Sequence, residues 1–294
     1  MAKIPPHPRK RLGQHFLIDP NLLRKIVNLA EIQPSDFVCE IGPGGGALTG
    51  LLCQTAKQVL ALEVDPRMVE FLKTELAGCT NLEVQEQDAL KYPFDQLPPL
   101  TMVVANLPYN ISTPILFRLL EAQQNISRMV LTVQLEVAQR LVAKPSTKDY
   151  GVLSVMVQHL ADVKFGFKVS RKCFRPVPAV DSGVVRLDIR QDHQENPQDL
   201  THFQWVVRTA FGQRRKTLLN AFRSAGISNE CLQQAQRETG IVLTRRAETL
   251  SILEFRFIAK CVQQGCPEIV KGPPPGHLSA NVLEALLDER REGQ

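Results

Sequence analysis

Short apolar runs alternate with amphipathic helical segments along residues 21–143, and this order limits the fold more than any other feature of the sequence. The expected strands cover 37–42, 58–65, 81–90, 101–106 and 128–134. The expected helices cover 21–30, 47–56, 66–78, 114–122 and 135–143. Strands that alternate with helices form βαβ units, whose strands are parallel and are covered by helices on both faces. The sequence therefore predicts an α/β fold with a mostly parallel sheet.

The chain changes character near residues 191–200, where QDHQENPQD precedes a basic stretch with helical patterning. Ten Lys or Arg residues and four acids lie between Thr201 and Val262, so this stretch carries +6, whereas the whole chain carries +5. A second basic cluster consists of Lys3, Arg9, Lys10 and Arg11. Two basic clusters on an otherwise near-neutral chain are explained equally well by a polyanionic partner and by a charged surface that only contacts solvent. We expect three parts: an α/β domain at 1–195, a helical basic domain at 196–266, and a Pro/Gly linker with a short helix, of unassigned role, at 267–294.

Cysteine usage and hydropathy indicate the compartment. No apolar stretch is long enough to span a bilayer, and the N-terminus MAKIPPHPRKRLGQHF lacks the apolar region of a secretory signal. A transit peptide is the weaker alternative, because prolines would break its amphipathic helix. The seven cysteines are odd in number and have no CxxC spacing, which argues against zinc and against a disulfide framework. We expect a cytoplasmic protein without a metal.

A glycine-rich turn and two acids follow three successive expected strands. Gly42, Gly44 and Ala47 in EIGPGGGALT fit the G-x-G-x-x-G/A pattern, in which glycines permit a tight turn and close approach of a ligand. Glu63 ends the next strand, where a carboxylate can accept both hydroxyls of a ribose. Asp88 ends the third strand, where it would meet an adenine edge. Taken singly, a ligand-free glycine turn or a surface acid is common, but the three together indicate a bound nucleoside.

The sequence NLPY at 106–109 ends the fourth expected strand and distinguishes two cofactors. NAD accounts for the glycine turn and for Glu63. S-adenosylmethionine accounts for Asp88 as well, and gives the tetrapeptide a purpose.

The tetrapeptide carries the groups needed to methylate the exocyclic amine of adenine. This amine is a poor nucleophile because its lone pair is conjugated with the ring, and two hydrogen-bond acceptors aimed at it turn the lone pair outward. The Asn106 side-chain oxygen and a neighbouring backbone carbonyl can act as these acceptors, and Pro108 holds Leu107 extended. Tyr109 offers a flat face for an extruded base, at roughly 1–3 kcal/mol per stacked base. The alternative for NLPY alone is an ordinary turn with Tyr109 in the core.

A series of longer motifs carries a family resemblance. They are RKRLGQHFL, EIGPGGGALT, ALEVD, QDAL, NLPYNIST, KDYGVLSVMVQ, CFRPVPAVDSGVVRL and FGQRRKTLLNAF, and they extend from Arg9 to about Val262. With them the chain resembles the bacterial small-subunit (16S) ribosomal RNA adenine N6,N6-dimethyltransferases. The resemblance implies a Rossmann-like S-adenosylmethionine-dependent methyltransferase fold with a small all-α C-terminal domain. It also implies methylation of two adjacent adenosines in a hairpin near the 3′ end of 16S rRNA, and a role in small-subunit biogenesis.

The resemblance also assigns site residues by position. The family's S-adenosylmethionine contacts match His15, Leu17, Gly42, Glu63, Asp88 and Asn106. Relatives more often have asparagine at position 15, so a backbone contact is expected from His15. The catalytic set matches Asn106, Leu107, Pro108, Tyr109 and Phe174. Within it, Phe174 is the second aromatic residue that closes on the flipped base, an assignment that depends on the resemblance alone.

The segment GQRRKTLLNAFR is expected to bind RNA. It places Arg214, Arg215, Lys216 and Arg223 on a predicted helix, while Phe211, Leu218, Leu219 and Phe222 face the domain core. Folded ribosomal RNA is read largely through its shape and its phosphates, and a single extruded base enters the active site. The expected partner is 16S rRNA within the small ribosomal subunit, bound by a monomeric protein without membrane contact.

Other functions compete with this prediction. A large-subunit ribosomal RNA methyltransferase shares the catalytic set, but FGQRRKTL argues against it. A DNA adenine methyltransferase would have a larger sequence-reading domain. A ribosome-assembly factor that acts mainly by binding the small subunit stays open, since the same basic surface serves both roles. A nucleotide-dependent oxidoreductase leaves Asp88, NLPY and the basic domain unexplained.

Overall fold

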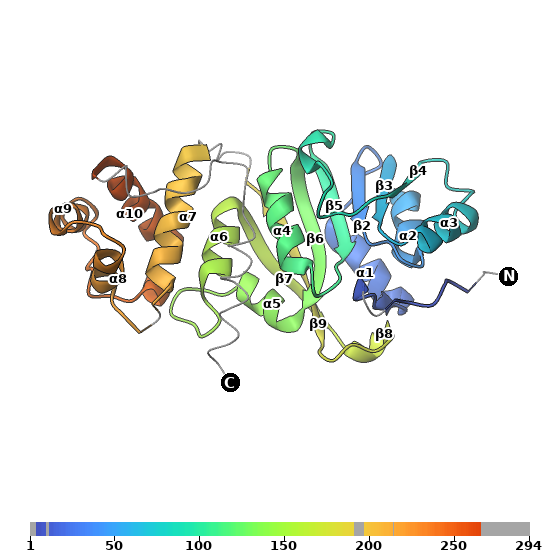
Figure 1. The fold of residues 1–294 in the computed structure, drawn as a ribbon. Coiled ribbons are helices and arrows are strands. Elements are labelled where there is room, and N and C mark those ends of the chain that lie inside the picture. Colours follow the sequence, from blue (N-terminus) through green and yellow to red (C-terminus); the bar gives the residue numbers. More distant parts are fainter. Residues whose placement is uncertain (1–3, 10–11, 191–196, 214, 266–294) are drawn as a thin grey trace. The chain divides into compact units, whose positions relative to one another are not determined.

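The computed structural model describes residues 4–9, 12–190, 197–213 and 215–265 of the chain (Figure 1). Its contacts divide the chain into two compact units. The sheet unit combines Met1–Gln139 with Ala161–Gln191, and the helical unit combines Arg140–Leu160 with Asp192–Gln294. Arg140–Leu160, which the sequence placed in the first domain, thus groups with the C-terminal part. Which boundaries delimit independently folding domains stays a prediction.

A seven-stranded sheet forms the sheet unit, with the strand order β4-β3-β2-β5-β6-β9-β7. Strands β4, β3, β2, β5 and β6 run parallel to one another, and β9 is antiparallel to both of its neighbours, β6 and β7. The strands are β2 (Phe37–Ile41), β3 (Gln58–Glu63), β4 (Leu82–Glu86), β5 (Thr101–Asn106), β6 (Ile126–Gln134), β7 (Ala161–Val169) and β9 (Ser182–Ile189). This sheet confirms the predicted α/β, Rossmann-like fold class.

The helices that precede and follow the parallel strands along the chain lie close to the bounds expected from the sequence. They are α1 (Pro20–Ala30), α2 (Ala47–Thr55), α3 (Pro66–Glu75), α4 (Ser112–Glu121) and α5 (Leu135–Leu141). Two of them begin in the same way, with a capping aspartate followed by a proline. The Asp19 side chain accepts hydrogen bonds from the N–H groups of Asn21 and Leu22, and Asp65 accepts one from Arg67. An N-cap acceptor and a proline at the first helical position both favour a helix start.

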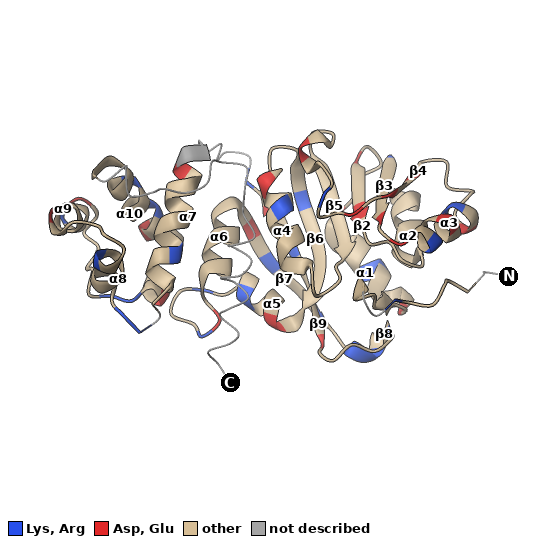
Figure 2. Ribbon diagram, viewed as in Figure 1, with Lys and Arg blue, Asp and Glu red and all other residues tan. Residues whose placement is uncertain are grey.

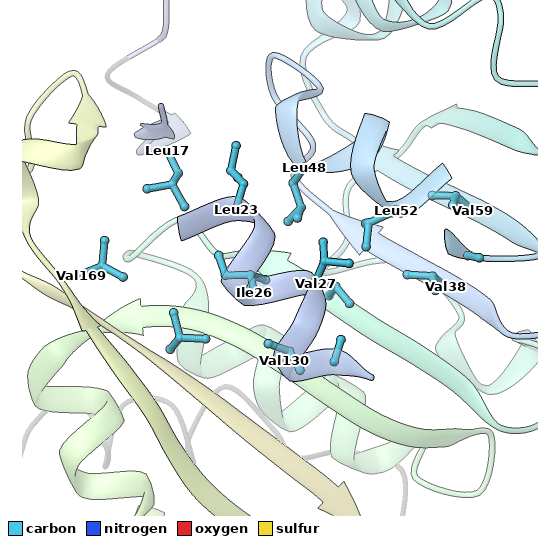
Figure 3. Packing of buried hydrophobic residues seen from close by; sticks show 14 of the residues in the cluster. Leu17, Leu23, Ile26, Val27, Val38, Leu48, Leu52, Val59, Val130 and Val169 are labelled. Atoms are coloured by element: carbon cyan, nitrogen blue, oxygen red, sulfur yellow. The ribbon is translucent and has the colours of Figure 1, made fainter. Parts of the chain in front are cut away.

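A hydrophobic core lies between α1, α2 and one face of the sheet (Figure 3). Ile26 and Val27 of α1 pack in this cluster with residues from six strands of the sheet, including Val38 and Val130. Within β5, three consecutive residues, Val103–Ala105, are at most 1% exposed. Because alternate residues of a strand point to opposite faces, the sheet is covered on both sides, as expected for parallel strands.

A separate core forms inside the helical unit. Its helices are α6 (Val152–Leu160), α7 (Pro197–Phe211), α8 (Leu218–Ser224), α9 (Asn229–Thr239) and α10 (Ile252–Gly265). Buried aromatic rings join them: Phe211 stacks on Phe255, and His159 stacks on Phe203. None of the helices in the described ranges is long and apolar enough to cross a membrane.

The helix predicted through GQRRKTLLNAFR is interrupted, so that part of the prediction is wrong. Helix α7 ends at Phe211 and α8 begins at Leu218, which leaves Arg215 and Lys216 in the connection between them. The Thr217 side chain accepts a hydrogen bond from the Asn220 N–H and caps α8. A threonine that caps a new helix has non-helical backbone angles, so the two helices are separate.

Candidate active site

A cavity opens at the carboxyl ends of β2, β3, β4 and β5. The space between its walls, open solvent included, is about 660 Å³. Eight of the residues expected from the sequence line it: His15, Gly42, Glu63, Asp88, Asn106, Leu107, Pro108 and Tyr109. The parallel register accounts for this meeting, because the carboxyl ends of parallel strands lie at one edge of the sheet.

The glycine turn after β2 requires its glycines. Gly42, Gly44 and Gly46 have φ angles of +68°, +52° and +78°, which side chains disfavour. A Cβ on Gly44 would lie 2.5 Å from Cε1 of Phe16. The Gly42 N–H donates to the Leu62 carbonyl at 2.9 Å and ties the turn to β3. The turn is therefore a fixed cradle, with backbone exposed to the cavity.

Glu63 is held in the cavity wall by two backbone N–H groups. One carboxylate oxygen, Oε2, accepts from Gly44 at 3.1 Å, and the other, Oε1, accepts from Asp65 at 2.9 Å. Burial raises the pKa of the Glu63 carboxyl, and these two hydrogen bonds oppose that rise. Since a carboxylate oxygen has two lone pairs, both oxygens can still accept from a ligand's hydroxyls.

Asp88 lies beyond the end of β4, in the part of the cavity lined also by Gln87 and Ala89. Its Oδ1 accepts a hydrogen bond from the Leu90 N–H at 2.9 Å, which fixes the carboxylate. Among the described residues, Oδ2 has no hydrogen-bond donor. An acceptor of this kind suits an exocyclic amine.

Asn106 has a fixed amide. Its Nδ2 donates to the backbone carbonyl of His15 at 2.8 Å, so Oδ1 is the atom left to accept a hydrogen bond. The next residue, Leu107, is buried, and its N–H donates to the Thr132 carbonyl of β6 at 3.1 Å. The first half of NLPY is thereby anchored to two separate segments of the sheet unit.

Tyr109 is held at both its ring and its hydroxyl. The His15 imidazole stacks on the ring, with 5.6 Å between centroids and 26° between planes. The phenol oxygen lies 2.6 Å from Oγ of Ser182. His15 is itself tied down, because Nδ1 lies at hydrogen-bond distance, 2.7 Å, from the Pro176 carbonyl.

Two of the expected site residues do not line this cavity. Leu17 and Phe174 belong to β1 (Phe16–Leu17) and β8 (Phe174–Arg175), a two-stranded sheet in which they pair directly. Both side chains are buried in the α1–α2 core, Phe174 completely. Leu17 instead borders a neighbouring hollow, together with Gly42 and Asn106. Closure of Phe174 on a flipped base stays a prediction.

Sequence reasoning missed two residues at the site. Glu40 of β2 is 2% exposed and borders the neighbouring hollow, and burial raises the pKa of its carboxyl to about 8. Its Oε2 has no hydrogen-bond partner among the described residues. An acid inside the apolar run FVCEIG was a usable signal. Ser182 gave none, because only tertiary contact brings it to Tyr109.

The expected RNA-binding residues belong to the helical unit. Arg215, Lys216 and Arg223 are exposed, and Arg214 lies outside the described residues. Basic positions occur in the α7–α8 connection and on α8 (Figure 2). Nε of Arg223 donates to Oδ1 of Asn229 at 2.7 Å, which restrains that side chain. In neither unit do the described residues contain a group of three or more His, Cys, Asp or Glu that could hold a metal ion.

Comparison with protein families and curated relatives gives a consistent result. The family described as "Ribosomal RNA adenine dimethylase" matches residues 7–264. The "Ribosomal RNA small subunit methyltransferase A" of Moorella thermoacetica is 45% identical over 267 residues, 87% of this chain and 93% of the relative. The protein of the same name from Clostridium acetobutylicum is 44% identical over 249 residues, 84% of this chain and 90% of the relative.

Solved structures support the same fold. A dimethyladenosine transferase from Plasmodium falciparum has a TM-score of 0.76 and 28% sequence identity, covering 85% of this chain and 98% of that one. The 23S rRNA methyltransferase ErmE has a TM-score of 0.68 and 29% identity, covering 85% of this chain and 100% of that one.

Proposed function

The chain belongs to the ribosomal RNA adenine dimethylase family, and from this premise we propose how its residues carry out the reaction. It is an S-adenosylmethionine-dependent ribosomal RNA adenine dimethyltransferase of the small-subunit type. The proposed substrate is a pair of adjacent adenosines in a hairpin near the 3′ end of 16S rRNA, converted to N6,N6-dimethyladenosine. Cytoplasmic location, a monomeric state and a part in small-subunit biogenesis complete the proposal.

The side chains and backbone that line the cavity support S-adenosylmethionine as its ligand. Gly42 and Gly44 of the glycine turn line the cavity without a side chain, so a ligand can approach their backbone closely. Glu63 would accept the ribose hydroxyls, and Asp88 would accept from the adenine amine through Oδ2. Glu40 supports the fit as well, because a buried carboxylate with an unpartnered oxygen suits the cationic methionine end. The backbone near His15 and Leu17 would contact that same end.

The cofactor supplies an electrophilic methyl group on a sulfonium, and the protein prepares the nucleophile. Asn106 would accept one N–H of the target amine through Oδ1, and the Leu107 carbonyl would accept the other. The hydrogen bond from Nδ2 of Asn106 to the His15 carbonyl is the observation that carries this proposal, because it orients the amide before the substrate arrives. Tyr109 would stack on the extruded base.

A second methyl transfer needs no additional residue. After the first transfer the methylated nitrogen loses one proton to solvent and retains one N–H, which Oδ1 of Asn106 can still accept. Exchange of the spent cofactor would then restore the starting arrangement. The reaction therefore requires orientation and partial-charge stabilisation, with no general base of shifted pKa.

Transfer of labelled methyl groups would test the proposal. The substrates are unmethylated small subunits, naked large-subunit RNA and duplex DNA, and the products are identified by nucleoside mass spectrometry. We expect dimethyladenosine in the small subunits alone, and its loss in Asn106→Ala. Label in another substrate would support the methyl-transfer reaction and contradict the proposed 16S rRNA partner.

A binding role on the small subunit is the second candidate. The exposed cations Arg215 and Lys216 in the α7–α8 connection favour it, since they suit a phosphate backbone whether or not methyl transfer follows. Tight binding to small subunits without any label would support an assembly factor in place of an enzyme.

A further inference from the structure

Ser182 makes a contact with the site that the proposed reaction has not used. It is the first residue of β9, is 0% exposed, and has its hydroxyl oxygen 2.6 Å from the phenol oxygen of Tyr109. Its backbone is paired on both sides, with Gln134 of β6 and with Val169 of β7. The hydroxyl is therefore attached to one of the most constrained positions of the sheet.

We propose that Ser182 is a positioning residue for methyl transfer, which acts by fixing the position of the Tyr109 ring. This inference rests on the proposed function, in which the target adenine stacks on that ring. Residues 174–181, immediately before Ser182, form the segment in which the resemblance places the base-closing Phe174. Ser182 thus joins that segment to the stacking residue.

The need for such an anchor follows from the geometry of the ring. A tyrosine side chain rotates about its Cα–Cβ and Cβ–Cγ bonds, and the His15 imidazole stacks on the ring of Tyr109. The face that receives a base has to stay open, so packing alone leaves the ring free to tilt. A short hydrogen bond at the far end of the ring opposes rotation about the Cα–Cβ bond, because that rotation moves the phenol oxygen most, whereas rotation about the Cβ–Cγ bond leaves this oxygen in place. A tilted ring would carry the stacked amine away from Oδ1 of Asn106.

The start of β9 is itself braced, which makes Ser182 a fixed point. Asp181, the residue before it, accepts a hydrogen bond from the Arg171 N–H at 3.0 Å and forms an ion pair with Lys168 at 2.8 Å. The Asp181 carbonyl accepts from the Leu135 N–H at 2.9 Å. These contacts hold the serine even when the hydroxyl has no phenol to bind.

A double-mutant cycle separates this role from mere satisfaction of a buried polar group. The variants are Ser182→Ala, Tyr109→Phe and the double variant, assayed on unmethylated small subunits. Each single change deletes the same hydrogen bond, so we expect kcat to fall by about threefold to tenfold in each, with the KM for S-adenosylmethionine unchanged. In the Tyr109→Phe background, Ser182→Ala should have no further effect on kcat.

Ser154→Ala is the matched control. Ser154 is also 0% exposed, and its hydroxyl donates to the Arg140 carbonyl at 2.6 Å within the helical unit. The Ser154→Ala change should lower the melting temperature, as Ser182→Ala does, and should leave kcat unchanged. Tyr109→Phe leaves β9 unchanged and keeps the inference testable even if Ser182→Ala folds poorly.

Three outcomes would overturn the inference. The first is an unchanged kcat in both single variants. The second is a kcat in the double variant that falls by the product of the two single-variant decreases. The third is a decrease of kcat in Ser154→Ala as large as that in Ser182→Ala. Failure of the proposed function is distinguishable from all three, because the unaltered protein would then transfer no methyl group to small subunits.

Discussion

His15 contacts both residues that would hold the target adenine, through two different parts of itself. Its backbone carbonyl accepts from Asn106, and its imidazole stacks on Tyr109. The first contact survives any substitution that preserves the backbone, whereas the second depends on the ring. Through the backbone contact, position 15 would still orient Asn106 if it carried another side chain.

Replacing His15 should therefore affect the reaction much less than replacing Asn106. In Asn106→Ala we expect kcat to fall by about 10²–10³-fold, the range for one preorganised active-site hydrogen-bonding group. In His15→Asn we expect kcat and S-adenosylmethionine affinity within about threefold of the unaltered protein, since the carbonyl still orients Asn106. Steady-state kinetics and calorimetric titration would check both, and a His15→Asn enzyme as slow as Asn106→Ala would contradict the backbone role.

Glu40 should make the ligand-free protein sensitive to pH. Its pKa is raised from 4.5 to about 8 by burial, so the folded state binds more protons than the unfolded state between these values. Stability is therefore greatest below about pH 4.5 as far as this group is concerned, and is lost as pH rises through about 8. Thermal melting of Glu40→Gln against pH should show a flatter profile than the unaltered protein between pH 5 and 8. Parallel profiles would show that Glu40 does not titrate there.

The same acid links pH to cofactor binding. A cation close to Glu40 lowers the pKa of its carboxyl, so binding of S-adenosylmethionine should release a proton below about pH 8. We expect affinity to rise from pH 6 to pH 8, and Glu40→Gln to abolish the rise. Calorimetry in two buffers of different ionisation enthalpy measures the released proton, and no release at pH 7 would place the cation elsewhere.

At the scale of elements, the turn between β2 and α2 is the most constrained part of the site. Gly44→Ala places a side chain at φ +52° and a Cβ 2.5 Å from Phe16. We expect a loss of about 1–2 kcal/mol in unfolding free energy from the backbone strain alone, together with weaker cofactor binding. Gly78→Ala is the control, because nothing lies within 4 Å of its Cβ position. Denaturant unfolding and binding titrations should show a lower unfolding free energy and weaker cofactor binding for Gly44→Ala than for Gly78→Ala. Equal values for the two variants would contradict the predicted backbone strain.

The connection between α7 and α8 is the element expected to contact RNA phosphates. Arg215→Gln with Lys216→Gln should weaken small-subunit binding and reduce the salt slope by roughly 0.7–0.9 per lost contact. The control is Arg237→Gln with Lys260→Gln, which removes the same charge from exposed positions of the same unit. Binding measured from low to moderate salt distinguishes a phosphate contact from a general charge effect. Equal salt slopes in the two double variants would show that the α7–α8 connection makes no specific contact with RNA phosphates.

At the scale of the whole molecule, the cavity residues belong to one unit and the exposed cations of the α7–α8 connection to the other. Cofactor binding should stabilise the sheet unit by about 2.7 kcal/mol at a concentration a hundredfold above Kd. Hydrogen exchange should show this protection around 12–16, 41–46 and 62–65, with little change in α8 to α10. Glu63→Ala should remove most of it. Protection centred on the helical unit would show that the cofactor does not bind in this cavity.

The sequence by itself determined the α/β order, the helices that begin near residues 21 and 66, and the strand-end residues Gly42, Glu63, Asp88 and Asn106. All of these depend on periodicity or capping within a few residues, and parallel pairing then gathers the strand ends at one edge. Local signals also misled, since the helical pattern near Arg215 hid the cap at Thr217.

Only the tertiary structure decided the contacts that give the site its geometry. The Asn106–His15 and Tyr109–Ser182 hydrogen bonds join residues 91 and 73 positions apart, and no local pattern specifies which distant partner will meet. The grouping of Arg140–Leu160 with the C-terminal helices and the burial of Phe174 are of the same kind. Such contacts arise from the packing of complete elements, which periodicity within one element does not encode.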